Sequence, residues 1–140
     1  MVIGIVGAGA MGAGIAQVAA MAGNEVRLFD TSSEAKNNAL LKITESINKF
    51  VAKGQVFPEE GVAITGRIYL CEKLETFADC DVVIEAIIED LGVKKTLFIN
   101  LESVVTAHCI LATNTSSLSV TSIASSLNRP EPCVGVQLLN

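Results

Sequence analysis

The sequence predicts a doubly wound α/β fold, in which a mostly parallel sheet carries helices on both faces. Short apolar runs typical of buried strands alternate along the whole chain with longer segments of helical periodicity. The 140 residues are 50% hydrophobic and 18% charged, which suffices for one compact domain with its own core, or for one domain of a larger protein.

The first unit is a strand, a glycine-rich turn and a helix. Val2 to Val6 is the expected strand, and the helix continues through Ile15 to Ala20. Gly23 is the expected left-handed end of that helix, because glycine adopts positive φ without steric cost. Glu25 to Phe29 is the second strand, and Asp30 follows its last residue.

The next segment is expected to be mostly helical. Ser32 or Ser33 can cap a long helix, whose apolar residues recur at three- and four-residue spacing up to Gly54. Pro58 suits the first turn of a shorter helix, after which Arg67 to Leu70 is a candidate third strand.

The second half of the chain repeats the alternation of strand and helix. The expected strands are Asp81 to Glu85, Ile110 to Thr113 and Cys133 to Leu139, and the expected helices are Val93 to Val105 and Ser119 to Leu127. Together these elements predict six strands in one wound sheet.

In such a sheet the strand order reverses beside the first strand. The reversal places a crevice at the carboxyl ends of the first and fourth strands. Gly7, Asp30, Ala86 and Asn114 each follow the end of an expected strand, so they are the first candidates for a binding site.

Residues 7–12 form a G-x-G-x-x-G motif between the first strand and the first helix, with Ala8, Ala10 and Met11 between the glycines. Gly7 permits a tight turn, Gly9 lets the backbone approach a pyrophosphate, and Gly12 lets the helix pack closely on the strand. The helix N-terminus offers N–H donors to the anion. In this context the motif predicts a Rossmann-type dinucleotide site, although a glycine-rich turn with only a packing role would look the same.

Asp30 lies where the second strand ends, and its carboxylate can accept hydrogen bonds from both adenosine ribose hydroxyls. A 2′-phosphate would be repelled there, and no Arg follows at positions 31–33. The predicted cofactor is therefore NAD rather than NADP.

Three segments resemble the NAD-binding domain of the L-3-hydroxyacyl-CoA dehydrogenases: Gly7 to Ala16, Glu85 to Lys95 and Ala112 to Leu118. The resemblance extends over essentially the whole chain. It implies that residues 1–140 are the NAD-binding domain of an enzyme that oxidises L-3-hydroxyacyl-CoA to 3-oxoacyl-CoA by hydride transfer to nicotinamide. It further implies an acyl-CoA substrate and a C-terminal helical dimerisation domain, absent from this chain, through which the full-length protein would form a homodimer.

The resemblance also assigns residues to the nicotinamide half of the cofactor. Ala86, Glu89 and Lys94 would lie along this half, Asn114 would contact the cofactor, and Ser116 would contact the substrate. From the residue types alone, Glu89 and Lys94 fit equally well in a solvated first helix turn, and the run from Asn114 could simply cap a helix.

The long second helix resembles the projecting helical arm of the family. Ser46 and Lys53 occupy the places from which a serine and a lysine contact the CoA moiety, and a cation there suits an adenosine phosphate. A solvated helix face is the alternative for both residues.

One position departs from the family. Gln137 stands where the resemblance places the catalytic histidine, and an amide cannot accept a proton at neutral pH. We therefore expect the isolated chain to be inactive, and a non-catalytic relative that binds NAD and acyl-CoA is the alternative function. A dehydrogenase of the 3-hydroxyisobutyrate type is a second alternative, which the run at Ala112 to Leu118 disfavours.

Charge, hydropathy and cysteine spacing argue against several other classes of protein. The formal net charge of −5 gives no footprint for nucleic acid, and no apolar stretch is long enough to span a membrane. No basic leader precedes the first strand, so a cytoplasmic location is expected. The four cysteines have no metal-ligand spacing and are expected to be reduced and mostly buried. His108 falls between a helix and a strand, on the amino-end side of the sheet, where a structural or surface role is expected, so no metal site is predicted.

Overall fold

The structure is a computed structural model that describes residues 1–87, 89–113, 122–128 and 133–135. Its strands form one parallel sheet in the order β3-β2-β1-β4-β5-β6. The strands are β1 (Val2–Val6), β2 (Glu25–Phe29), β3 (Ile68–Cys71), β4 (Val82–Glu85), β5 (Ile110–Thr113) and β6 (Cys133–Gly135). The strand order reverses at β1, which lies between β2 and β4, and this confirms the predicted doubly wound sheet.

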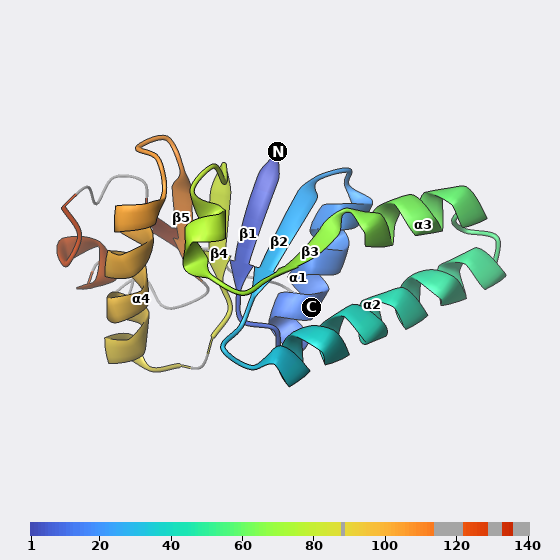
Figure 1. Ribbon diagram of the computed structural model, residues 1–140, viewed down its shortest axis with the longest axis horizontal. Helices are drawn as coiled ribbons and strands as arrows, with labels where there is room; N and C mark the ends of the chain where they lie inside the picture. The colour runs from blue at the N-terminus through green and yellow to red at the C-terminus, as the bar shows by residue number, and fades with distance from the viewer. Residues whose placement is uncertain (88, 114–121, 129–132, 136–140) are drawn as a thin grey trace.

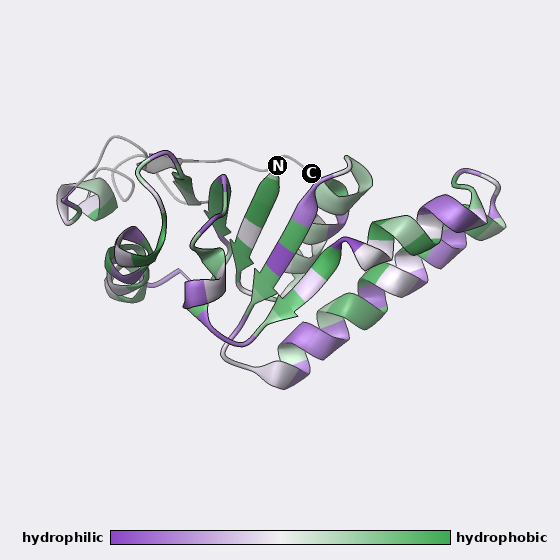
Figure 2. Cartoon of the chain, turned by 45° about the horizontal axis from the view of Figure 1, so that its top comes forward, coloured by the Kyte–Doolittle hydropathy of each residue, from purple (hydrophilic) through white to green (hydrophobic). Residues whose placement is uncertain are grey.

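Helices cover both faces of this sheet (Figure 1). The helices are α1 (Ala10–Met21), α2 (Ser33–Ala52), α3 (Pro58–Gly66) and α4 (Leu91–Val104), with a short 3₁₀ helix η1 (Leu74–Phe77). The first three pack around Ile5, Val26 and Leu28 on one face, whereas α4 and η1 pack around Val83 and Leu111 on the other. Hydrophobic residues accordingly concentrate on the central strands (Figure 2).

Most element boundaries agree with the sequence-based expectations. Gly23 has φ +94°, and the Ser32 hydroxyl accepts the Ala35 N–H at the start of α2. The strand expected at Arg67 to Leu70 begins one residue later, because Arg67 ends α3.

In the second half of the chain, α4 begins at Leu91 rather than Val93, since the Asp90 carboxylate accepts the Val93 N–H. Residues 122–125 are helical within the expected Ser119 to Leu127 segment. The start of that helix and the continuation of the last strand to Leu139 lie outside the described residues.

The α2 and α3 helices run side by side and project beyond the sheet (Figure 1). A Cβ at Gly61 of α3 would approach the side chains of Val51 and Ile47 to 3.0 and 3.3 Å. Glycine therefore allows the close spacing of this pair. The two helices form a projecting arm, of which α2 is the part that the family resemblance implies.

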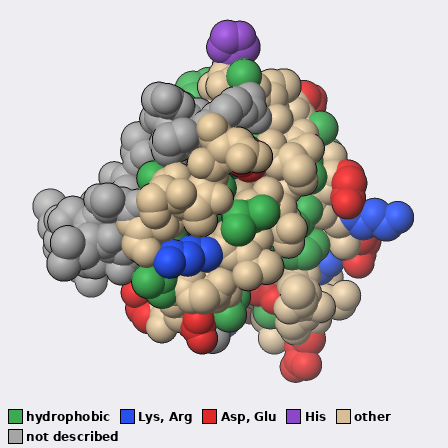
Figure 3. Space-filling view, turned by 90° about the vertical axis from the view of Figure 1, so that its left-hand side faces the viewer, with side chains coloured by type: hydrophobic (Ala, Val, Ile, Leu, Met, Phe, Trp, Pro, Cys, Tyr) green, Lys and Arg blue, Asp and Glu red, His purple; other side chains and the backbone are tan. Residues whose placement is uncertain are grey.

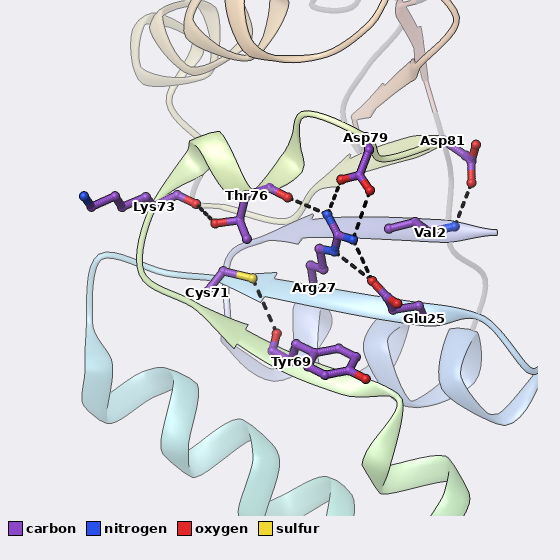
Figure 4. A network of polar contacts seen from close by, with 9 residues as sticks. All are labelled: Val2, Glu25, Arg27, Tyr69, Cys71, Lys73, Thr76, Asp79 and Asp81. Atoms are coloured by element: carbon purple, nitrogen blue, oxygen red, sulfur yellow. Dashed lines mark hydrogen bonds and ion pairs between the residues drawn. The ribbon is translucent and has the colours of Figure 1, made fainter.

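A polar network holds η1 against β2 (Figure 4). The Arg27 guanidinium donates to Glu25 at 2.8 Å, to the Thr76 carbonyl at 2.6 Å and to both carboxylate oxygens of Asp79. The hydrogen bond with Asp79 raises the pKa of Arg27 and lowers that of Asp79. The sequence alone did not predict η1 or this network.

Three of the cysteines, Cys71, Cys80 and Cys109, are free and buried, which confirms the expectation for those three. The side chain of Cys133 lies outside the described residues. His108 lies in the turn before β5, at the amino end of the sheet as expected, and it is exposed, which favours the surface role over the structural one. Among the described helices, none combines the length and hydropathy that a membrane crossing requires.

Candidate functional site

The glycine motif forms the turn between β1 and α1, and two of its glycines are required by the chain's own packing. Gly7 has φ +110°, and a Cβ there would lie 2.5 Å from the Ala86 carbonyl oxygen. A Cβ at Gly12 would lie 1.7 Å from the Gly7 carbonyl oxygen. Both positions therefore have the turn and packing roles that the sequence predicts.

Gly9 is different. Its φ of −74° is accessible to any residue, and a Cβ there would meet no described atom within 4 Å. The packing of the described residues thus gives no reason for glycine at this position. Approach of a ligand to the backbone does give one, since Gly9 precedes the first turn of α1, where amide donors point outward and no acidic residue occurs. The turn therefore fits a pyrophosphate.

Asp30 lies directly beside this turn. Its Oδ2 accepts the Ala8 N–H and its Oδ1 accepts the Ser32 N–H, each at 2.8 Å. Each carboxylate oxygen keeps a lone pair for a further donor, so Asp30 can still accept hydrogen bonds from a ribose. The two backbone contacts hold the carboxylate in place before any ligand arrives.

A cleft of about 480 Å³ lies along the carboxyl ends of β1, β2 and β4. Its lining is mostly apolar: Val6, Gly7, Gly9, Phe29, Asp30, Thr31, Ala35, Ala86, Ile87, Val93 and Leu97. A second hollow of about 250 Å³ shares three of these residues, and its lining is Gly9, Ala10, Met11, Glu85, Ala86, Ile87 and Glu89. The structure therefore brings the predicted glycine turn, Asp30, Ala86 and Glu89 to one edge of the sheet.

Lys94 is almost fully buried, with 1% of its surface exposed. Its Nζ lies 3.2 Å from Glu85 Oε1 and 2.9 Å from Glu89 Oε1. The solvated helix turn considered as an alternative for Lys94 is therefore wrong, whereas Glu89 is largely exposed as well as paired with Lys94. Glu85 itself has no exposed surface.

Sequence reasoning assigned no role to Glu85, although it lies within a quoted motif. The signal was an acidic residue at the end of an otherwise apolar strand, followed by lysines in the first turn of the next helix. A carboxylate in that position is buried with its neighbours on the strand, so it requires a positively charged partner.

The predicted CoA contacts lie on the arm. Ser46 is half-buried and accepts a hydrogen bond from Gln17 Nε2 at 2.8 Å, and Lys53 is exposed at the C-terminal end of α2. Neither residue lines the two hollows described above, so the structure does not bring them to the edge of the sheet. Asn114, Ser116 and Gln137 lie outside the described residues.

Comparison with known proteins decides the family. A family profile described as "3-hydroxyacyl-CoA dehydrogenase, NAD binding domain" matches residues 2–140. The 3-hydroxybutyryl-CoA dehydrogenase of Bradyrhizobium diazoefficiens is 39% identical over 138 residues, which are 99% of this chain and 47% of that protein. The chain belongs to the 3-hydroxyacyl-CoA dehydrogenase family.

Solved structures agree with this membership. The crystal structure of 3-hydroxybutyryl-CoA dehydrogenase from Escherichia coli K12 has a TM-score of 0.95 and 39% identity, with 100% of this chain and 30% of that one covered. The (S)-3-hydroxybutyryl-CoA dehydrogenase of Ralstonia eutropha has a TM-score of 0.93 and 30% identity, with 99% and 49% covered.

The chain thus corresponds to the NAD-binding domain of the 3-hydroxyacyl-CoA dehydrogenases, and NAD is confirmed as the cofactor of this domain. It spans about half the length of the first curated relatives it matches. Membership also favours the acyl-CoA enzymes over the small hydroxy acid alternative.

Proposed function

We propose that this chain binds NAD along the carboxyl edge of its sheet and serves the oxidation of an L-3-hydroxyacyl-CoA. The observation that carries the proposal is the glycine turn at the start of α1, with Asp30 fixed beside it by two backbone donors. NAD, when bound, accepts the hydride. In the proposal a second, helical domain completes the protein, which forms a homodimer in the cytoplasm and, with its charge of −5, takes no nucleic acid.

In the proposal, different residues of this chain bind different parts of NAD and of the substrate. The first turn of α1 takes the pyrophosphate, Asp30 takes the adenosine ribose, and Ala86, Glu89 and Lys94 face the nicotinamide half. The family resemblance adds Asn114 to that half. It also assigns Ser116 as a contact of the substrate oxygen, and it assigns Ser46 and Lys53 as contacts of the CoA moiety.

Gln137 affects whether the chain can catalyse the reaction. Hydride transfer from C3 of the substrate requires that its hydroxyl proton be removed, and the Gln137 amide does not accept a proton near neutral pH. The chain by itself is therefore expected to bind ligand without turning it over. The same residue favours a second candidate function, a non-catalytic relative that binds NAD and acyl-CoA.

Two measurements on the 140-residue chain test the proposal. Calorimetric titration is expected to show saturable NADH binding, and NADH oxidation in the presence of acetoacetyl-CoA is expected to stay at background. Absence of saturable NADH binding would contradict the proposed function, and ordinary turnover would contradict the inactivity assigned to Gln137.

A third measurement separates the two candidate functions. In a longer protein that includes the second domain, Gln137→His is expected to raise the rate by about 10²- to 10⁴-fold if the protein is an enzyme with a weakened base. An unchanged rate would favour the non-catalytic relative.

A further inference from the structure

Glu85 is the last residue of β4 and the most deeply buried carboxylate among the described residues. It pairs in register with Val6 on one side and Thr113 on the other. Thr113 is the last residue of β5, so Glu85 lies in the middle of the carboxyl edge, beside the hollow that it lines with Gly9 and Glu89.

The carboxylate of Glu85 receives three donors from three different segments. Its Oε2 accepts the Ile87 N–H at 2.7 Å, from the residues that follow β4. Its Oε1 accepts the Thr113 hydroxyl at the end of β5 and lies 3.2 Å from Lys94 Nζ of α4. Charge-assisted hydrogen bonds of this kind are stronger and shorter than neutral ones.

Each of these segments carries a residue assigned to the nicotinamide half of the cofactor. Ala86 and Glu89 belong to the segment after β4, Lys94 is itself a partner of Glu85, and Asn114 directly follows Thr113. Among the described residues, the partners of the Glu85 carboxylate are Ile87, Thr113 and Lys94, and none of these belongs to the glycine turn or is Asp30, which serve the adenosine half. The buried carboxylate therefore links only one half of the site.

We propose that Glu85 is a positioning residue that holds the nicotinamide side of the cleft in shape. The inference rests on the proposed NAD-binding function. Without the carboxylate, the buried Lys94 ammonium keeps only Glu89, and the Ile87 amide and Thr113 hydroxyl lose their acceptor. A deeply buried ammonium whose single remaining partner is a largely exposed carboxylate is costly, so Lys94 is expected to turn toward solvent and to take Glu89 with it.

The test compares two ligands on the same variant. ADP carries the adenosine and pyrophosphate groups and lacks the nicotinamide riboside, whereas NADH carries all of them. In the Glu85→Gln variant, calorimetric titration is expected to show an NADH dissociation constant at least about tenfold higher than in the unmodified chain. A change of this size corresponds to the loss of about one charge-assisted contact. The ADP dissociation constant is expected to change less than about twofold.

The matched control is Val83→Ala, which removes buried volume from the same strand and the same face without touching the polar cluster. It is expected to lower stability while leaving the NADH-to-ADP ratio of dissociation constants within about twofold of its original value. A selective loss of NADH in this control would overturn the proposal, because general weakening of β4 would then explain the result.

Glu85→Asp provides a second variant if Glu85→Gln does not fold, since the shorter carboxylate keeps the charge but cannot reach all three donors. In whichever variant folds, an NADH loss no more than threefold greater than the ADP loss would overturn the positioning role. If the unmodified chain binds ADP and NADH equally weakly or not at all, the proposed function itself is contradicted, so the two failures are distinguishable.

Discussion

At the scale of single residues, the glycine motif contains two kinds of glycine that the sequence cannot tell apart. Gly7 and Gly12 are required by the carbonyl oxygens of Ala86 and Gly7, while no described atom restricts Gly9. The pattern predicted the turn role of Gly7 and the packing role of Gly12 correctly because both depend on local geometry, whereas the pyrophosphate role of Gly9 stays a prediction. The distinction between an internal and an external reason for glycine required the packed structure.

This distinction leads to opposite expectations for two alanine variants. Gly12→Ala places a methyl group against backbone and is expected to lower the free energy of unfolding by about 3 kcal/mol or more. Gly9→Ala is expected to cost less than about 1 kcal/mol, yet to abolish NADH binding because the methyl group occupies the approach to the pyrophosphate. Urea unfolding and NADH titration measure the two effects, and full NADH affinity in Gly9→Ala would contradict the ligand-based reason.

The buried thiols predict a pH dependence. Burial raises the pKa of Cys80 to about 12 and that of Cys109 to about 11, whereas an unfolded thiol has a pKa of about 8.5. Between these values the unfolded chain holds fewer protons than the folded one, so the free energy of unfolding falls as the pH rises above about 8.5.

Urea unfolding at pH 7, 8.5 and 10 measures this fall. The Cys80→Ala variant is the control, because it removes one of the buried thiols, and it is expected to show a shallower decline of the free energy of unfolding. An identical fall of the free energy of unfolding with pH in the two proteins would show that the Cys80 thiol does not contribute to the pH dependence.

Buried charged residues mark the limit of sequence reasoning at this scale. The motif around Glu85 and Lys94 was recognised, but the burial of Lys94 and its two carboxylate partners depends on how α4 packs against β4 and β5. Lys36 is a second case, since its Nζ turns inward to the Cys71 carbonyl. A lysine at a helical position is exposed far more often than buried, and only tertiary packing reverses that preference.

At the scale of elements, local chemistry predicted the helix ends where a cap or a glycine sets them. Ser32 begins α2, Gly23 follows α1, and Pro58 begins α3 as expected. The errors were one or two residues at β3, at α4 and at β4, which begins at Val82 rather than Asp81, and the four-residue η1 was missed. That helix is too short to show periodicity, and it is held by the buried Phe77 and the Arg27 network rather than by propensity.

The arm formed by α2 and α3 gives an expectation for CoA recognition. Lys53→Glu reverses an exposed charge at the end of α2 and is expected to raise the acetoacetyl-CoA dissociation constant about three- to tenfold at low salt. NADH binding is expected to stay unchanged, since Lys53 does not line the cleft. Titration of both ligands measures the difference.

Lys73→Glu is the matched control for this experiment. It makes the same change of charge at an exposed residue that precedes η1, away from the arm. An equal loss of acetoacetyl-CoA affinity in this control, or an equal loss of NADH affinity in Lys53→Glu, would refute the role given to Lys53.

At the scale of the whole molecule, the alternation of strands and helices predicted the topology, because parallel strands require crossovers and these are right-handed. The sequence did not reveal which apolar surfaces of the folded domain remain exposed to solvent. Leu91, Val93 and Ile99 of α4 are partly exposed, and Figure 3 shows hydrophobic side chains reaching the surface on that side. In the proposed function, the second, helical domain would cover part of this apolar surface.

Binding of the cofactor is expected to stabilise the whole domain. At an NADH concentration about 100 times the dissociation constant, linkage adds about 2.7 kcal/mol, which for a chain of this size raises Tm by roughly 10 °C. NADPH at the same concentration is expected to produce a much smaller rise, because its 2′-phosphate meets the Asp30 carboxylate. Differential scanning calorimetry measures both, and equal shifts would contradict the assignment of Asp30 to the ribose.

Among the described residues, the sheet separates two hydrophobic cores with no side chain in common, one beneath α1 to α3 and the other beneath α4. A dinucleotide along the carboxyl edge would touch elements belonging to both, with its adenosine part on the first and its nicotinamide part on the second. Amide hydrogen exchange should therefore slow in both cores when NADH binds, and chiefly in the first when ADP binds. On this view the ligand joins two halves of the domain that could otherwise open independently.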